Sequence, residues 1–153
     1  MTEGRRVDLA YSTVMLIALV LYASASGGTL YAGFWYPVVI PLLVVVWSLI
    51  LGTPAYFLTG TTAATVVTLL TYINIISTTE HPDGLLVLGH LFSVPGMLMG
   101  IGIAAWALKH RLTATLPWIV ASIGFVGTAL GFLAAQLIVC NSLMYCSVLS
   151  WGA

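Results

Sequence analysis

His90 is the residue of this sequence whose type and place most suggest chemistry, because it lies inside a long apolar stretch. An ionisable side chain within such a stretch is costly and commonly marks a functional site. The amides of Asn74 and Gln136 fall at a similar depth in neighbouring apolar stretches, so we expect the three side chains to form one polar cluster. An imidazole titrates near neutral pH, so His90 could sense pH or contact a ligand there. The alternative is a neutral imidazole hydrogen-bonded to another helix.

Hydroxyl groups make a second pattern. Thr61, Thr65, Thr68 and Tyr72 fall within a narrow arc of one helix at ~100° per residue. Such a stripe can line a path for a neutral solute, or it can join helices while each threonine bonds back to its own backbone. We expect no Asp, Glu, Lys or Arg to be buried within a span, which argues against an ion-coupled pump.

Small residues at four-residue spacing make a third pattern, on two consecutive segments joined by a short basic turn. In lipid, helices associate by close backbone approach, which small residues allow. These faces predict either packing of the two helices on each other or an interface with a partner. The first face carries Gly96, Gly100 and Ala104, and the second carries Gly127, Gly131 and Ala135.

The two cysteines, Cys140 and Cys146, follow the last apolar stretch. Six residues of continuous helix would separate them by ~9 Å along the axis. A disulfide needs Cα atoms within roughly 7 Å, so a bridge requires the helix to end near Asn141 and Ser142. We expect a disulfide, and a helix that continues through Cys146 would exclude it.

Recognisable catalytic signatures such as G-x-S-x-G, H-E-x-x-H and a phosphate-binding loop are missing from the sequence. We therefore expect no enzyme, no catalytic residue and no cofactor. Haem binding would need a second buried histidine at the depth of His90. Metal-ligand donor types are also present in Glu80, His81, Asp83 and His90. Four such residues this close together in the sequence are more typical of a solvated loop, so we expect no metal site.

Composition sets the class of protein to which these patterns belong. The chain has 153 residues, of which 61% are hydrophobic and 5% charged, with net charge +0 and a mean hydropathy of +1.12. A soluble domain carries about 25% charged residues, and a nucleic-acid binder needs a basic patch. The sequence therefore predicts a single integral membrane domain without nucleic-acid binding.

Breakers and charges divide this domain into five predicted transmembrane helices. A bilayer core of ~30 Å needs about 20 apolar residues per helix. Arg5 and Arg6 place the N-terminus in the cytoplasm, and Lys109 and Arg111 should share that side, which requires an even number of crossings between them. The C-terminus is then outside. We expect an all-α bundle with helices near residues 9–25, 33–51, 55–76, 85–108 and 113–139.

A different reading of the first segment stays open. An arginine pair, an apolar run over residues 14–22 and the small residues Ala23-Ser24-Ala25 also resemble a secretory signal with its cleavage site. Asp8 and the pair Ser12-Thr13 interrupt that pattern, which favours a retained first helix.

Size, architecture and the scarcity of catalytic groups indicate a protein that acts by helix contacts within the bilayer. These general features resemble those of bacterial inner-membrane immunity proteins that block pore-forming toxins, and equally those of small accessory subunits. We therefore expect a membrane protein partner or a homo-oligomer. The alternative is a small-solute transporter or channel lined by the threonine stripe.

Overall fold

A computed structural model describes residues 3–25, 33, 35–78, 84–110 and 116–142. All regular structure in these ranges is helical. The helices are α1 (Glu3–Ala25), α2 (Tyr36–Ile50), α3 (Phe57–Thr78), α4 (Gly84–His110) and α5 (Pro117–Ser142).

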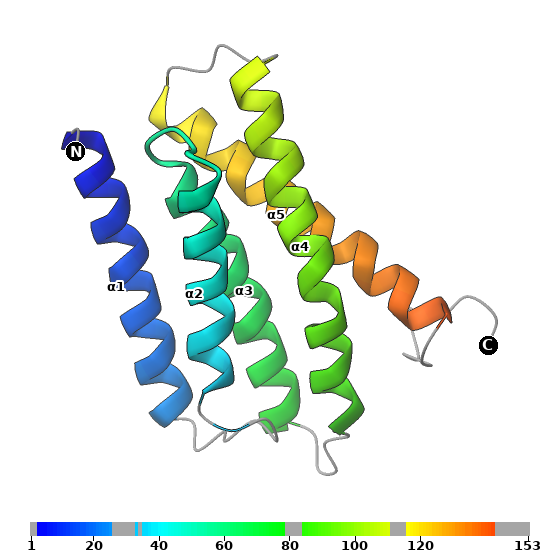
Figure 1. Cartoon of the computed structure of the whole chain (residues 1–153). Coiled ribbons are helices and arrows are strands. Elements are labelled where there is room, and N and C mark those ends of the chain that lie inside the picture. The colour runs from blue at the N-terminus through cyan, green and yellow to red at the C-terminus, as the bar shows by residue number, and fades with distance from the viewer. Residues whose placement is uncertain (1–2, 26–32, 34, 79–83, 111–115, 143–153) are drawn as a thin grey trace.

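The first four helices alternate in direction, and α5 lies obliquely across α3 and α4 (Figure 1). Helix α3 is central, since it packs against each of the other four helices. Buried apolar side chains surround it in two clusters. One includes Leu19 of α1, Ile40 of α2 and Leu69 of α3, and the other includes Met97 and Phe132 of α4 and α5.

Four of the helices, α1, α3, α4 and α5, are long and apolar enough to cross a membrane. Helix α2 is apolar but has 15 residues, about 22 Å at ~1.5 Å per residue, which is less than a bilayer core of ~30 Å. Of the five predicted spans, four are therefore helices long enough to cross a membrane, and the fifth, α2, is a shorter apolar helix.

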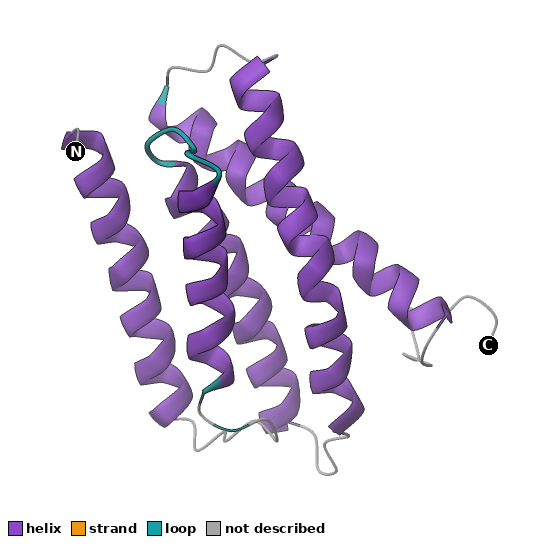
Figure 2. Cartoon of the chain, viewed as in Figure 1, coloured by secondary structure: helices purple, strands orange, loops and turns teal. Residues whose placement is uncertain are grey.

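Residues at both ends of α2 stop the helix, so the predicted range 33–51 was too long. Gly33 has φ +79°, outside the helical region, and Pro37 occupies the first turn, where its missing N–H does no harm. Gly52, with φ +58°, follows the last turn. The loop from there to α3 appears as the teal segment beside the top of α2 (Figure 2).

The other predicted helix limits move by a few residues, except at the N-terminus. Helix α1 begins at Glu3 rather than at residue 9 and so contains Arg5, Arg6 and Asp8. The charged residues were predicted to precede the span, but Asp8 packs inside the bundle. Helix α5 begins at Pro117, since proline suits a first helical position.

The basic residues Arg5 and Lys109 lie at the same end of the bundle. The Arg5 guanidinium donates to the carbonyl of Thr53, 3.2 Å away, and the Lys109 ammonium donates to the carbonyl of Leu51. Both carbonyls belong to the α2–α3 loop, so this loop is held by a cation from α1 and another from α4. An even number of helices therefore separates the two cations, as the sequence predicted.

Candidate functional site

His90 lies in an aromatic environment built by three other helices. Its Nδ1 is 2.5 Å from the hydroxyl of Tyr36 on α2. Its ring centroid is 4.7 Å from that of Tyr72 on α3 and 5.0 Å from that of Phe132 on α5. The side chain is fully buried, and its Nε2 has no hydrogen-bond partner among the described residues. His90 thus joins α4 to α2 and packs against both α3 and α5.

Gln136 belongs to the same cluster, which extends along α5. Its Oε1 lies 2.5 Å from the hydroxyl of Ser93, and its amide nitrogen lies 3.5 Å from the sulfur of Cys140. Its side chain also interacts with that of Tyr72, which contacts His90. The structure therefore brings His90 and Gln136 together through Tyr72.

Asn74 is not part of this cluster, and the prediction that it joins His90 and Gln136 was wrong. It follows Tyr72 by two residues, so it points about 200° away around α3 and is exposed on the surface of the bundle. Depth in the membrane placed the three residues at one level but gave no information on helix rotation.

Two members of the cluster escaped the sequence reasoning. Ser93 lies three residues after His90, and that spacing places the two on one side of α4. Tyr36 is the first residue of α2, and it is buried although it lies at a helix end. Only the packing of α2 against α4 shows this.

The threonine stripe is packed rather than open. Thr61 and Thr65 are fully buried, and their hydroxyls, like that of Thr68, donate to carbonyls of α3 at 2.8–3.0 Å. Thr61 also lies 3.4 Å from the hydroxyl of Ser48 on α2, and Thr65 lies 3.5 Å from the sulfur of Met97 on α4. The stripe joins α3 to its neighbours.

A buried carboxylate at the other end of the bundle contradicts the expectation that no acidic residue is buried in a span. Asp8 is fully buried, and its Oδ1 accepts hydrogen bonds from the backbone N–H of Thr59 at 2.7 Å and from the Thr59 hydroxyl at 2.6 Å. The first turn of a helix leaves its N–H groups unsatisfied and favours negative charge. Asp8 of α1 therefore caps α3 from a different helix.

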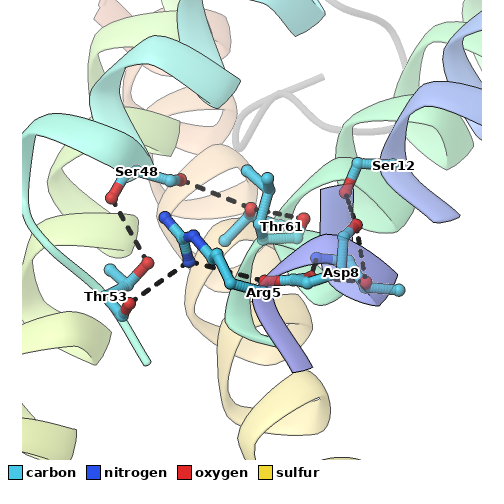
Figure 3. A network of polar contacts seen from close by, with 8 residues as sticks. Arg5, Asp8, Ser12, Ser48, Thr53 and Thr61 are labelled. Atoms are coloured by element: carbon cyan, nitrogen blue, oxygen red, sulfur yellow. Dashed lines mark hydrogen bonds and ion pairs between the residues drawn. The ribbon is translucent and has the colours of Figure 1, made fainter. Parts of the chain in front are cut away.

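The network around Asp8 extends to the α2–α3 loop (Figure 3). Arg5 lies 3.5 Å from the second carboxylate oxygen and donates to the carbonyl of Thr53. The Thr53 hydroxyl in turn donates to the carbonyl of Ser48. These contacts fix the relative positions of α1, α2 and α3, which is a structural task rather than a chemical one.

The two small-residue faces pack against each other where α4 crosses α5. A Cβ added to Gly100 would lie 2.1 Å from the carbonyl oxygen of Gly127, and one added to Gly131 would lie 2.3 Å from that of Gly96. Ala104 would approach a Cβ on Gly127, and Ala135 one on Gly96. The two small-residue faces therefore pack mainly against each other, and Gly96, Gly127 and Gly131 stay partly exposed.

The crossing leaves an apolar groove of about 840 Å³ on one side, which we call the α4–α5 groove. The small residues form its base. Exposed side chains form its walls, among them Met99 and Ile103 of α4 and Trp118, Leu130 and Ile138 of α5. In a membrane this groove faces the lipid.

Some predicted features fall on residues that the structure does not describe. Cys140 is buried near the end of α5, but Cys146 lies outside the described residues, so the predicted disulfide stays a prediction. Glu80, His81 and Asp83 also lie outside. Within the described ranges, no group of three or more His, Cys, Asp or Glu residues could hold a metal ion.

Comparison with protein-family models, with curated proteins and with solved structures finds no match to this chain.

Proposed function

We propose that this chain is a non-enzymatic membrane protein that binds a transmembrane helix of a partner protein in the α4–α5 groove. The length of the groove carries the proposal. Along α5, which runs obliquely (Figure 1), it extends from Trp118 to Val139, about 32 Å at ~1.5 Å per residue, and along α4 from Phe92 to Ala104, about 18 Å. A groove of this length accommodates several turns of a partner helix within the membrane.

The base and walls of the groove suit a helix. Helices attract one another in lipid by van der Waals packing, which close approach strengthens. The glycine and alanine base lets a partner backbone come near, and the large side chains of Met99 and Leu130 can interdigitate with those of the partner.

The packed interior supports binding over transport. Thr61 and Thr65 are fully buried with their hydroxyls bonded to α3, and neither they nor Thr68 line the α4–α5 groove. A transporter for a small solute remains the second candidate because the stripe lies between buried Asp8 towards one end and buried His90 towards the other. Uptake of glycerol into proteoliposomes above that of empty vesicles would favour this alternative.

The proposed cellular setting follows from charge and size. With Arg5, Arg6 and Lys109 in the cytoplasm of a bacterium, the C-terminus lies outside the inner membrane, where Cys140 and Cys146 can oxidise. An intact mass lighter by two hydrogen atoms than the reduced chain is the expected result. An immunity protein against a membrane-active toxin and an accessory subunit both fit this setting.

Filling the groove tests the proposal. Ala134 lines the groove and is exposed, so Ala134→Phe should fill it without disturbing the contact between α4 and α5. Ala10→Phe places the same side chain on the exposed surface of α1 as a matched control. A protein that co-purifies with the wild type and with Ala10→Phe should be lost from Ala134→Phe. Equal recovery with all three chains would contradict the proposal.

A further inference from the structure

A second groove lies between α1 and α3, with a volume of about 730 Å³. Its polar lining consists of Tyr22, Thr71 and Asn74. Tyr22 and Asn74 stand near the ends of their helices, which finish at Ala25 and Thr78. The apolar lining, which includes Met15 and Leu70, reaches deeper. The α1–α3 groove therefore has a polar end at the depth of the membrane interface and an apolar remainder.

The amide of Asn74 needs a partner from outside the described chain. It is exposed, and within the described ranges no side chain or backbone group hydrogen-bonds to it or to the hydroxyl of Tyr22. Thr71 differs, since its hydroxyl donates to the carbonyl of Val67 at 2.8 Å. An amide next to hydrocarbon without a hydrogen bond is costly, so an acceptor beside Asn74 and Tyr22 is favoured.

The length of the groove distinguishes the type of occupant. Along α3 it runs from Val66 to Ile75, about 14 Å at ~1.5 Å per residue, close to half of a ~30 Å bilayer core. A transmembrane helix would extend well beyond it, whereas one acyl chain of one leaflet fills such a length. None of the lining residues is charged, so an ionic headgroup has no partner among them.

We propose that the α1–α3 groove binds a glycerophospholipid, with one acyl chain along Met15 and Leu70 and its ester carbonyl accepting a hydrogen bond from the Asn74 amide. The site recognises the ester region, and the headgroup contributes little. This lipid site is separate from the α4–α5 groove, and neither proposal depends on the other.

Native mass spectrometry of the full chain with added lipid tests the site. The probes are dioleoyl phosphatidylethanolamine with ester linkages and its diether analogue, which lacks the carbonyls. The wild type should retain one ester lipid about five-fold better than the ether lipid, as expected for loss of one hydrogen bond. Asn74→Leu should bind both lipids equally, at the level of the ether lipid.

Two further variants separate the site from general effects on the protein. Asn141→Leu removes an exposed amide near the end of α5 and should keep the five-fold preference. Ala18→Phe adds a ring to a residue that lines the groove and should abolish retention of the lipid. The proposal is overturned if the wild type shows no preference for the ester lipid, if Asn141→Leu loses it too, or if the retained mass is a polypeptide.

Discussion

The contact between α4 and α5 makes a sharp prediction about two glycines that lie two residues apart. A Cβ on Gly100 would lie 2.1 Å from the carbonyl oxygen of Gly127 and 2.9 Å from the Cα of Gly131, so backbone must move to admit it. A Cβ on Gly102 would have nothing within 4 Å. The same substitution, glycine to alanine, should therefore have opposite effects at the two positions.

The expected magnitudes follow from packing and helix propensity. Overpacking a close contact costs about 1–3 kcal/mol, so Gly100→Ala should destabilise the protein by roughly that amount. Gly102→Ala should stabilise it by up to about 0.5–1 kcal/mol, because alanine loses less backbone entropy in a helix. At roughly 2–4 °C per kcal/mol, the two variants should differ in melting temperature by about 3–16 °C.

Thermal unfolding in one detergent, followed by circular dichroism, measures this difference. The free energy of unfolding should rank Gly102→Ala above the wild type and the wild type above Gly100→Ala. If both variants melt together, α4 and α5 do not cross at Gly100 and Gly127, and the α4–α5 groove loses its base.

Two further substitutions test the polar clusters. Asp8→Ala removes the cap of α3 and should lower the free energy of unfolding by about 1–2 kcal/mol, whereas Glu3→Ala, at the exposed start of α1, should change it little. Equal refolding yields and equal melting temperatures for Asp8→Ala and Glu3→Ala would argue against the cap. Tyr36→Phe leaves Nδ1 of buried His90 without its partner and should cost about 1–3 kcal/mol, and exposed Tyr11→Phe is the control. A Tyr36→Phe variant that melts with the wild type would show that this bond contributes nothing.

The sequence predicts the class of protein and the number of helices because both depend on local properties. Apolar stretches, the breaker at Gly52 and the proline at position 117 act within a few residues, and the helices follow them closely. The extent of α1 was missed because the charge of Asp8 indicates water, and only the N-terminus of α3 beside it makes burial favourable.

The candidate sites depend on how the helices rotate against one another, which one sequence does not give. The depth of Asn74 and Gln136 was read from chain position, but Asn74 faces the surface while Gln136 faces the interior. The glycine faces allowed two interpretations, because the four-residue spacing of small residues predicts a close helix contact but does not show which helix makes it. The grooves arise from the oblique course of α5 and from the spacing of α1 and α3, and no sequence pattern indicates either.

Cross-linking from the wall of the α4–α5 groove tests the central claim most directly. A photoreactive amino acid at Leu130, which is 61% exposed, should form an adduct with one polypeptide in native membranes. Adding Ala134→Phe should remove that adduct, and the same group at Val67, which is 50% exposed on α3, should not form it. The same polypeptide adduct from both positions, or an adduct that survives Ala134→Phe, would contradict the claim that the groove binds a partner helix.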